Sequence, residues 1–329
     1  MVTLIEEGAS TPSPERKETR FDSMKYVFGP VPSRRLGFSL GVDLLPYKTC
    51  SFDCIYCELG PTTCRTLEPK DLIPPEAVLA ELDDFLATTV QKIDYLTISG
   101  SGEPTLHPEL GHLIRAIKKK YTQPLALITN GSLFYNPLIL ERVKEADLII
   151  PSLDTVDPEA FQVINRPHPE LRLEAIIEGL ILLGQLPGPR IWLEALFLRG
   201  LNDQPAQIEA LSRTIKKINP EKVQINTVVR PPVEAFALAL DYRALEAIRG
   251  IIGPRAEIIA PPTVKADFQI EMLESEILGL VARRPCTAED LSRLTGFSRQ
   301  QTLDLLNRLL DQQKIAREGF NRNDFFLRR

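Results

Sequence analysis

Features that mark a secreted or membrane protein are scarce in this 329-residue sequence. No apolar run approaches the roughly 20 residues that a transmembrane helix needs, and no signal-peptide pattern opens the chain. The five cysteines are an odd number, which does not suit a framework of disulfides. The net charge is −5, so the surface as a whole does not favour nucleic acid. We therefore expect a cytoplasmic protein with no membrane partner.

Three of the five cysteines lie close together, at Cys50, Cys54 and Cys57. Thiolate ligands alone favour zinc, Cu(I) or an iron–sulfur cluster. A structural zinc site has four ligands, usually from two C-x-x-C pairs, and the sequence holds no second pair of that kind. A cluster held by three cysteines leaves one iron open to a small molecule, as catalysis requires. The other interpretation, a disulfide or a set of buried thiols, suits a secreted protein better.

The C-x3-C-x-aromatic-C spacing resembles that of the radical S-adenosylmethionine (radical SAM) enzymes. The resemblance implies that the three cysteines hold a [4Fe–4S] cluster, and that the amine and carboxylate of SAM chelate its open iron. It also implies that Tyr56 lies near the adenine. In that family one electron from the cluster cleaves SAM, and the resulting 5′-deoxyadenosyl radical abstracts hydrogen from the substrate. An electron donor such as flavodoxin or ferredoxin is the partner this implies.

The chain divides into three parts by composition. Residues 1–24 mix polar and charged residues without an apolar period, which predicts a disordered tail. Residues 25–262 alternate strands and helices with short connections, so their strands are expected to be parallel. About six such units predict an α/β fold, a partial (β/α)6 TIM-like barrel, which is also the form of radical SAM cores. Its strands are expected at 40–45, 95–99, 125–129, 147–153, 191–198 and 223–229.

Chemistry in such barrels sits at the C-terminal ends of the strands. The strand at 95–99 runs into Gly100, Gly102, Glu103 and Pro104, which resemble the family's Gly-Gly-Glu-Pro motif with a serine in place of one glycine. Glycine lets the backbone approach a ligand closely. The resemblance implies that this loop holds the ammonium group of SAM. Taken alone, the segment also fits a tight strand-to-helix turn.

The next two strands also end in polar residues, Thr129 and Asn130, then Ser152 and Asp154. The resemblance implies that these side chains contact the carboxylate and ribose of SAM. Hydroxyl and amide side chains are equally typical helix N-caps. Arg166 is expected either to pair with the SAM carboxylate or to be an ordinary surface arginine.

Three further charged residues are candidates for substrate or cofactor contacts. The adjacent Arg34 and Arg35 lie upstream of the cysteines, where they either bind an anion or form an ion-paired turn. Glu194 falls on the inward face of its strand. Because an inward carboxylate is costly unless it binds something, Glu194 is a candidate ligand or substrate contact.

The segment from 28 to 37 together with the cysteine motif resembles the wyosine-synthetase-like subgroup of radical SAM proteins. The tRNA-modifying member of that subgroup carries a second cysteine triad before the first. This chain departs from it, because no cysteine precedes Cys50.

Residues 263–329 resemble a winged helix-turn-helix domain. Helices are expected at 274–283, 287–294 and 298–312, followed by two strands at 314–317 and 324–327. From residue 293 onward eight basic residues face four acidic ones, a balance of 8 − 4 = +4. Such a basic helix and wing suits tRNA or another nucleic acid, and winged helices also dock proteins.

Two functions follow from the sequence. The first is a radical SAM enzyme that cleaves SAM reductively and abstracts hydrogen from an unidentified substrate, with an RNA base as one candidate. The alternative is an iron–sulfur redox sensor that regulates through nucleic-acid binding. A sensor has no use for the SAM-binding loops, so the enzyme is the leading hypothesis.

Overall fold

The computed structural model describes residues 25–70, 72–89, 91–259, 274–295 and 297–329. The predicted tail at 1–24 and the predicted boundary between 262 and 263 lie outside the described residues.

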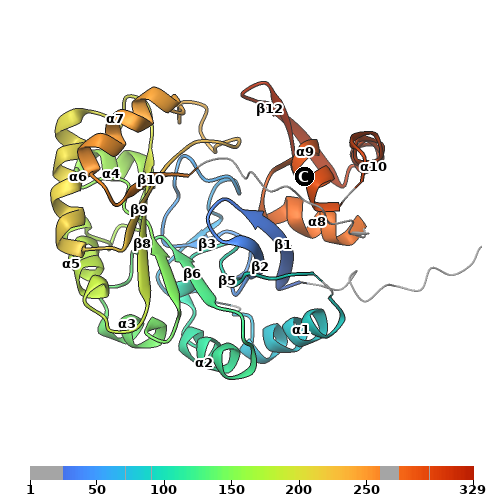
Figure 1. The fold of residues 1–329 in the computed structure, drawn as a ribbon, viewed down its shortest axis with the longest axis horizontal. Coiled ribbons are helices and arrows are strands. Elements are labelled where there is room, and N and C mark those ends of the chain that lie inside the picture. Colours follow the sequence, from blue (N-terminus) through green and yellow to red (C-terminus); the bar gives the residue numbers. More distant parts are fainter. Residues whose placement is uncertain (1–24, 71, 90, 260–273, 296) are drawn as a thin grey trace, which may run out of the picture.

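One eight-stranded sheet forms the centre of the molecule (Figure 1). Its order follows the chain: β1 (Val27–Ser33), β2 (Gly37–Val42), β5 (Tyr95–Ile98), β6 (Leu125–Thr129), β7 (Leu148–Pro151), β8 (Arg190–Phe197), β9 (Lys222–Thr227) and β10 (Ala256–Ile258). From β2 to β10 all neighbours are parallel, while β1 is antiparallel to β2. The C-terminal ends of the parallel strands therefore meet at one rim.

Helices connect the parallel strands and pack along the outside of the curved sheet (Figure 1). They are α1 (Pro75–Thr88), the 3-10 turn η2 (Pro104–Leu106), α2 (Leu110–Lys120), α3 (Pro137–Val143), α4 (Pro158–Asn165), α5 (Leu173–Gly184), α6 (Pro205–Ile218) and α7 (Tyr242–Ile252). The mostly parallel α/β architecture predicted from the sequence is confirmed, and it is consistent with a partial TIM-like barrel.

Helix α2 shows why the sequence folds this way. Leu110, Leu113, Ile114 and Ile117 recur at helical spacing and are all buried. Each such side chain contributes about 1.5–3 kcal/mol when it leaves water. The helix ends with basic residues at 118–120, which suit the negative end of its dipole.

The C-terminal unit has its own core. It contains α8 (Glu274–Arg283), β11 (Cys286–Thr287), α9 (Ala288–Thr295), α10 (Arg299–Asp311), β12 (Ile315–Phe320) and β13 (Asn323–Arg328), with strand order β11-β13-β12. The predicted helices and the second predicted strand agree with the structure within one residue at each end, whereas the strand predicted at 314–317 extends to Phe320 as β12. Classification of the unit as a winged helix stays a prediction.

The C-terminal unit packs against the strand edge formed by β1 (Figure 1). Val31 of β1 joins the apolar core of the unit. Near the rim, Arg328 lies over the ring of Tyr47 at 4.8 Å. The unit thus adjoins both the sheet edge and the end of the sheet that carries the predicted site.

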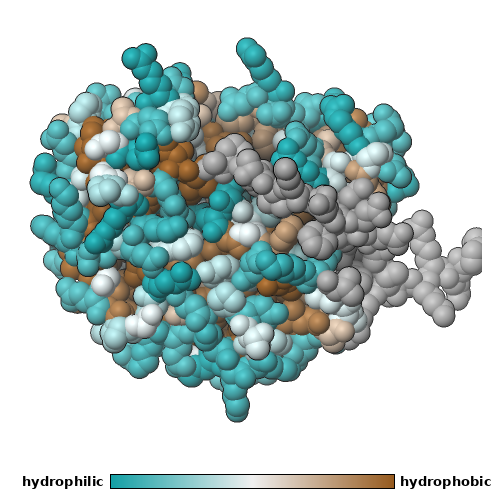
Figure 2. Space-filling model, in the orientation of Figure 1, coloured by the Kyte–Doolittle hydropathy of each residue, from teal (hydrophilic) through white to brown (hydrophobic). Residues whose placement is uncertain are grey.

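Figure 2 shows a mainly hydrophilic face on which apolar areas are interspersed. Among the described residues, no helix combines the length and apolar character needed to cross a bilayer.

Candidate active site

The cysteine loop, Cys50–Cys57, follows β2 and is held by a segment 110 residues further along the chain. Ile55 N donates to Ile164 O at 3.0 Å, and His168 N donates to Ser51 O at 2.8 Å. A small two-stranded sheet, β3 (Thr49–Cys50) with β4 (Cys64–Arg65), fixes the start of the loop. These backbone hydrogen bonds position the loop.

The three thiols are half-buried and none forms a disulfide. Burial, and then the nearby Glu103 carboxylate, raise the pKa of Cys50 to about 12. Burial also raises the pKa of Cys54. Lys48 Nζ donates to Cys57 Sγ at 3.0 Å. Burial disfavours the lysine charge, but the cysteines outweigh burial and raise the pKa of Lys48.

This donor set fits a cluster better than a single ion. No group of three or more Cys, His, Asp or Glu side chains among the described residues could hold one metal ion. In a [4Fe–4S] cluster each thiolate binds a different iron, so the three sulfurs need not meet at one point. The adjacent Lys48 stabilises thiolate charge, and metal binding displaces the thiol protons.

Two asparagines donate to the same sulfurs. Asn130 Nδ2 lies 3.6 Å from Cys50 Sγ, and Asn165 Nδ2 lies 3.6 Å from Cys54 Sγ. Asn130 was predicted as a site residue, whereas Asn165 and Lys48 were not. Asn165 ends a helix far from the motif in sequence, so only its tertiary contact reveals it.

Glu103 links the second strand loop to the third. Its Oε1 accepts from Thr129 Oγ1 at 2.6 Å, and its Oε2 accepts from Asn130 N at 2.6 Å. Thr105 N also donates to Oε1, at 2.9 Å. Burial raises the pKa of Glu103, and these hydrogen bonds oppose that shift. The structure therefore brings the predicted residues Glu103, Thr129 and Asn130 together.

The predicted glycines pack against the chain itself. A Cβ on Gly102 would lie 1.9 Å from Thr49 O, next to the cysteine loop. Gly100 has φ +145°, and a Cβ there would lie 2.4 Å from Asp43 Cγ. Pro104 opens a buried 3-10 turn. Close packing on Thr49, next to the cysteine loop, thus accounts for Gly102, whereas Gly100 packs against Asp43, directly after β2.

Asp154 forms a second polar cluster at the end of β7. Its Oδ2 accepts from Tyr56 Oη at 2.6 Å and Asn165 Nδ2 at 2.8 Å, and Oδ1 accepts from Leu196 N at 3.0 Å. A small cavity is lined by Phe52, Tyr56, Asn130, Ser152, Asp154 and Asn165. Tyr56, Asn130, Ser152 and Asp154 were each predicted as site residues, and they share this cavity.

Arg166 lies beside the cysteine loop, but its side chain faces another partner. Asp53 N donates to Arg166 O at 3.2 Å. The guanidinium pairs with Glu234, with 2.8 Å between Nη1 and Oε1. Its ion-pair partner in this structure is thus a carboxylate of the chain.

Arg35 and Glu194 form a buried ion pair, with 2.5 Å between Nη1 and Oε2. Asn226 Nδ2 donates to Glu194 Oε1 at 2.7 Å. Arg34 Nη1 donates to Asn226 Oδ1 at 3.1 Å. Glu194 therefore faces inward as predicted, and the ion-paired interpretation holds for Arg35. Arg34 has a different environment.

Comparison with known proteins identifies the family. The model of the "Radical SAM superfamily" matches residues 44–211, about half of the chain, including the cysteine loop and the strand ends described above. This chain belongs to the radical SAM superfamily. The protein is an enzyme of this class, whose members bind a [4Fe–4S] cluster and SAM and generally need an electron donor. The comparisons give no support to the alternative of a redox-sensing regulator.

Curated relatives cover nearly the whole chain. A UPF0026 protein of Methanocaldococcus jannaschii is 31% identical over 314 residues, 93% of this chain and 96% of that protein. A UPF0026 protein of Helicobacter pylori J99 is 34% identical over 272 residues, 82% of this chain and 87% of that protein. A Brachyspira hyodysenteriae protein named GTPase Obg is 34% identical over 301 residues, 90% of this chain. The chain spans only 44% of that relative's length.

Solved structures share the fold at low sequence identity. TYW1 with a lysine-pyruvate adduct bound aligns with a TM-score of 0.52 and 20% identity, covering 68% of this chain and 75% of that chain. A radical SAM methyltransferase from Sphaerobacter thermophilus aligns with a TM-score of 0.53 and 15% identity, covering 67% of this chain and 65% of that chain.

Proposed function

We propose that Cys50, Cys54 and Cys57 hold the [4Fe–4S] cluster and that SAM binds beside them at the strand rim. Asn130 supports this assignment most directly. Its backbone N–H donates to Glu103 and its side chain donates to Cys50 Sγ. One residue thus connects the glycine–glutamate loop to the cysteine loop, as a shared cofactor site requires.

When bound, the cluster and SAM together supply one-electron chemistry that ends in hydrogen abstraction from a substrate. The chain contributes the electrostatic setting. Lys48 and the N–H groups of Asn130 and Asn165 stabilise negative charge on the three sulfurs. Because hydrogen bonds to Glu103 and Asp154 hold Asn130 and Asn165 in place, little reorganisation is needed when the charge on the sulfurs changes.

The predicted SAM contacts are assigned by their positions. Glu103 presents a buried carboxylate for the methionine ammonium, with Gly100, Gly102 and Pro104 shaping its loop.

Tyr56, Ser152 and Asp154 line the adjoining small cavity, which supports a role in contacting the nucleoside, and Thr129 donates to Glu103. For Arg166 to pair with the SAM carboxylate, it must exchange its present partner Glu234.

The test is anaerobic reconstitution with iron and sulfide, followed by dithionite and SAM. The expected product is 5′-deoxyadenosine, measured by liquid chromatography. An intact cluster that yields none would contradict the proposal. Adding tRNA or metabolite fractions should then raise the yield when the substrate is present, and flavodoxin or ferredoxin should replace dithionite as electron donor.

We further propose that the C-terminal unit is a winged helix that brings an RNA base to the rim. Its strands reach the barrel near the cysteine loop, where Phe320 packs against an apolar cluster that includes Ile55. The exposed Arg299 and Arg322 supply basic charge on this unit. Filter binding of full-length protein to tRNA and duplex DNA should show retention of tRNA that falls with salt. Absence of salt-dependent retention would contradict this part.

A further inference from the structure

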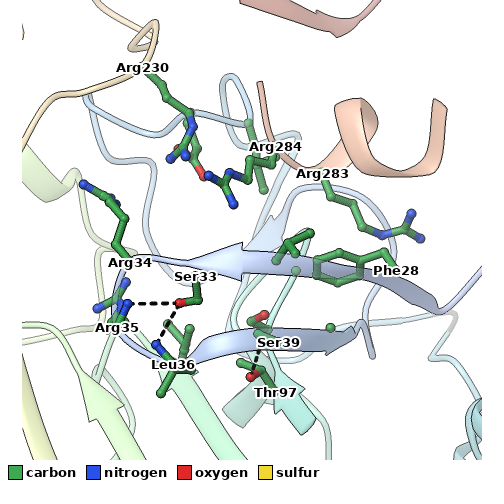
Figure 3. A pocket seen from close by; sticks show the side chains of 17 residues that line it. Phe28, Ser33, Arg34, Arg35, Leu36, Ser39, Thr97, Arg230, Arg283 and Arg284 are labelled. Atoms are coloured by element: carbon green, nitrogen blue, oxygen red, sulfur yellow. Dashed lines mark hydrogen bonds and ion pairs between the residues drawn. The ribbon is translucent and has the colours of Figure 1, made fainter. Parts of the chain in front are cut away.

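A cavity lies between the β1–β2 turn, the loop after β9 and the segment that follows α8 (Figure 3). Glu58, which directly follows Cys57, lines it, as do Ser99 and Gly100 at the end of β5. The cavity therefore borders both the cysteine loop and the glycine–glutamate loop. A molecule bound in it would lie next to the proposed cofactor site.

Positive charge dominates the lining of this cavity. One carboxylate, Glu58, accompanies five arginines: Arg34, Arg35, Arg230, Arg283 and Arg284. Three of the arginines form ion pairs: Arg35 with Glu194 at 2.5 Å, Arg230 with Glu58 at 2.6 Å and Arg283 with Asp43 at 3.3 Å. In the part of the chain that the structure describes, the other two have no carboxylate within ion-pair distance.

Arg34 is the first of the two arginines without an ion-pair partner among the described residues, although Glu58 and Glu194 partly offset its charge. Ser33 Oγ accepts from the backbone N–H groups of Arg35 and Leu36 at 3.4 and 3.2 Å, which orders the turn that presents Arg34 (Figure 3). Burial, and then the charges of Arg230 and Arg35, lower the pKa of Arg34 to about 10. Its hydrogen bond to a neutral amide does not offset this, so the free protein holds the charge at a cost.

Arg284, the second arginine without an ion-pair partner among the described residues, comes from the C-terminal unit, and Glu58 and Asp290 partly offset its charge. Its Nη1 donates to Pro32 O at 3.4 Å, while its buried Nε has no hydrogen-bond partner among the described residues. Burial, and then the charge of Arg230, lower the pKa of Arg284. A buried donor without a partner is uncommon and calls for a missing acceptor.

Arg230 lies between these two residues and is held in place. Its Nη1 donates to Glu58 at 2.6 Å, and its Nε donates to Pro285 O at 3.0 Å. Figure 3 shows Arg34, Arg230 and Arg284 entering one space from three different segments. Three guanidinium groups in this arrangement offer several N–H donors to one oxyanion.

We propose that Arg34, Arg230 and Arg284 bind an oxyanion of the substrate, a phosphate or carboxylate group. This inference rests on the proposed function, because the cavity can hold a substrate for radical chemistry only if the cofactor binds at the adjoining site. It also gives the C-terminal unit a direct part in substrate binding. A second cavity is lined by the same three arginines and, from that unit, by Thr287, Glu289, Asp290 and Asn323.

The experiment is calorimetric titration of the reconstituted protein with inorganic phosphate, with malonate and with tRNA, at constant ionic strength in chloride. Wild type should bind at least one probe, and Arg34→Gln and Arg284→Gln should each weaken that binding about tenfold or more. Arg213→Gln, on the exposed face of α6, removes the same charge elsewhere and should bind as wild type does. Binding of tRNA alone would assign the oxyanion to RNA phosphate, and binding of malonate or phosphate to a small substrate.

A second readout separates binding from a structural role. Without anion, Arg34→Gln should melt at or above the wild-type temperature, because a buried like charge is removed. The inference would be overturned by no probe binding in wild type, by binding in both arginine variants as tight as in wild type, or by a lowered melting temperature for Arg34→Gln. Formation of 5′-deoxyadenosine is measured separately in wild type and Arg213→Gln. This assay does not depend on anion binding, so it shows whether the proposed function holds even if the anion-binding inference is wrong.

Discussion

Two neighbouring regions of the rim, the cysteine loop and the arginine cavity, differ in whether their buried charged groups have partners within the chain. At the cysteine loop the carboxylates of Glu103 and Asp154 accept hydrogen bonds from donors of the chain itself. In the arginine cavity Arg34 and Arg284 have no carboxylate partner within the described residues. The first region is organised by the chain's own hydrogen bonds, which suits the fixed geometry that the proposed cluster and SAM site requires. The second is left incomplete, which suits a ligand that arrives and departs.

Loss of a cysteine ligand should have the largest effect on the first region. Cys54→Ala should abolish the brown chromophore and the bound iron after reconstitution, because two thiolates do not hold a [4Fe–4S] cluster. Iron analysis and the visible spectrum measure this. Cys64→Ser is the matched control, since that exposed thiol sits on β4 beside the loop. Full iron content in Cys54→Ala would refute the ligand assignment.

Arg35 and Arg34 are adjacent in sequence but should respond differently to substitution. Arg35→Gln leaves Glu194 buried without its cationic partner, so the free energy of unfolding should fall by about 3 kcal/mol. Arg34→Gln should leave the free energy of unfolding unchanged or raise it. Urea denaturation of the two variants side by side measures the contrast. Equal losses would show that both arginines are structural and would erase the distinction between the two regions.

Gly102→Ala probes the packing of the glycine loop on the cysteine loop. The added Cβ would meet the carbonyl oxygen of Thr49 at 1.9 Å, so the backbone must shift, at a cost of about 1–3 kcal/mol. Gly250→Ala is the control, because no atom lies within 4 Å of its added Cβ and alanine favours the helix. The melting temperature should fall for Gly102→Ala and should stay the same or rise for Gly250→Ala.

The pH dependence of stability should show the smallest effect. Burial alone would raise the pKa of Glu194, but Arg35 outweighs burial and holds it below the ordinary value of 4.5. The stabilisation from ionised Glu194 is therefore complete above that value and is lost as pH falls through the lowered pKa. Wild type should exceed Glu194→Gln in stability at pH 7, and the gap should narrow below about pH 4.5 in urea titrations. A stability difference between the two proteins that does not change with pH would contradict the lowered pKa of Glu194.

Local patterns predicted much of the barrel. The apolar stripe of α2 and the strand at Leu125–Thr129 fall where hydrophobic periodicity places them, because period and burial are properties of a short segment. The expected strand at 40–45 was displaced, since β2 spans Gly37–Val42 and pairs with an antiparallel β1 that the Pro- and Gly-rich sequence concealed. The three-residue strand β10 was not predicted either, because it is short and closely follows the Gly253-Pro254 pair.

The site residues likewise fall into those that a local sequence motif predicts and those that only the fold brings together. Cys50, Cys54 and Glu103 stand out because their motifs are contiguous in sequence. Asn165 and Arg284 join them only through tertiary contacts, and no local spacing marks either residue. Arg34 was identified as a candidate anion ligand, but its separation from Arg35 depends on which of the two reaches Glu194. That choice is made by side-chain packing across the sheet.

The proposed function requires an open iron that faces the loops proposed to bind SAM. Electron paramagnetic resonance of the reduced, reconstituted protein, recorded before and after SAM is added, tests this directly. The account predicts a clear change in the cluster signal on SAM addition, because a new ligand reaches the iron that the cysteines leave free. An unchanged signal from a fully loaded protein at saturating SAM would contradict it.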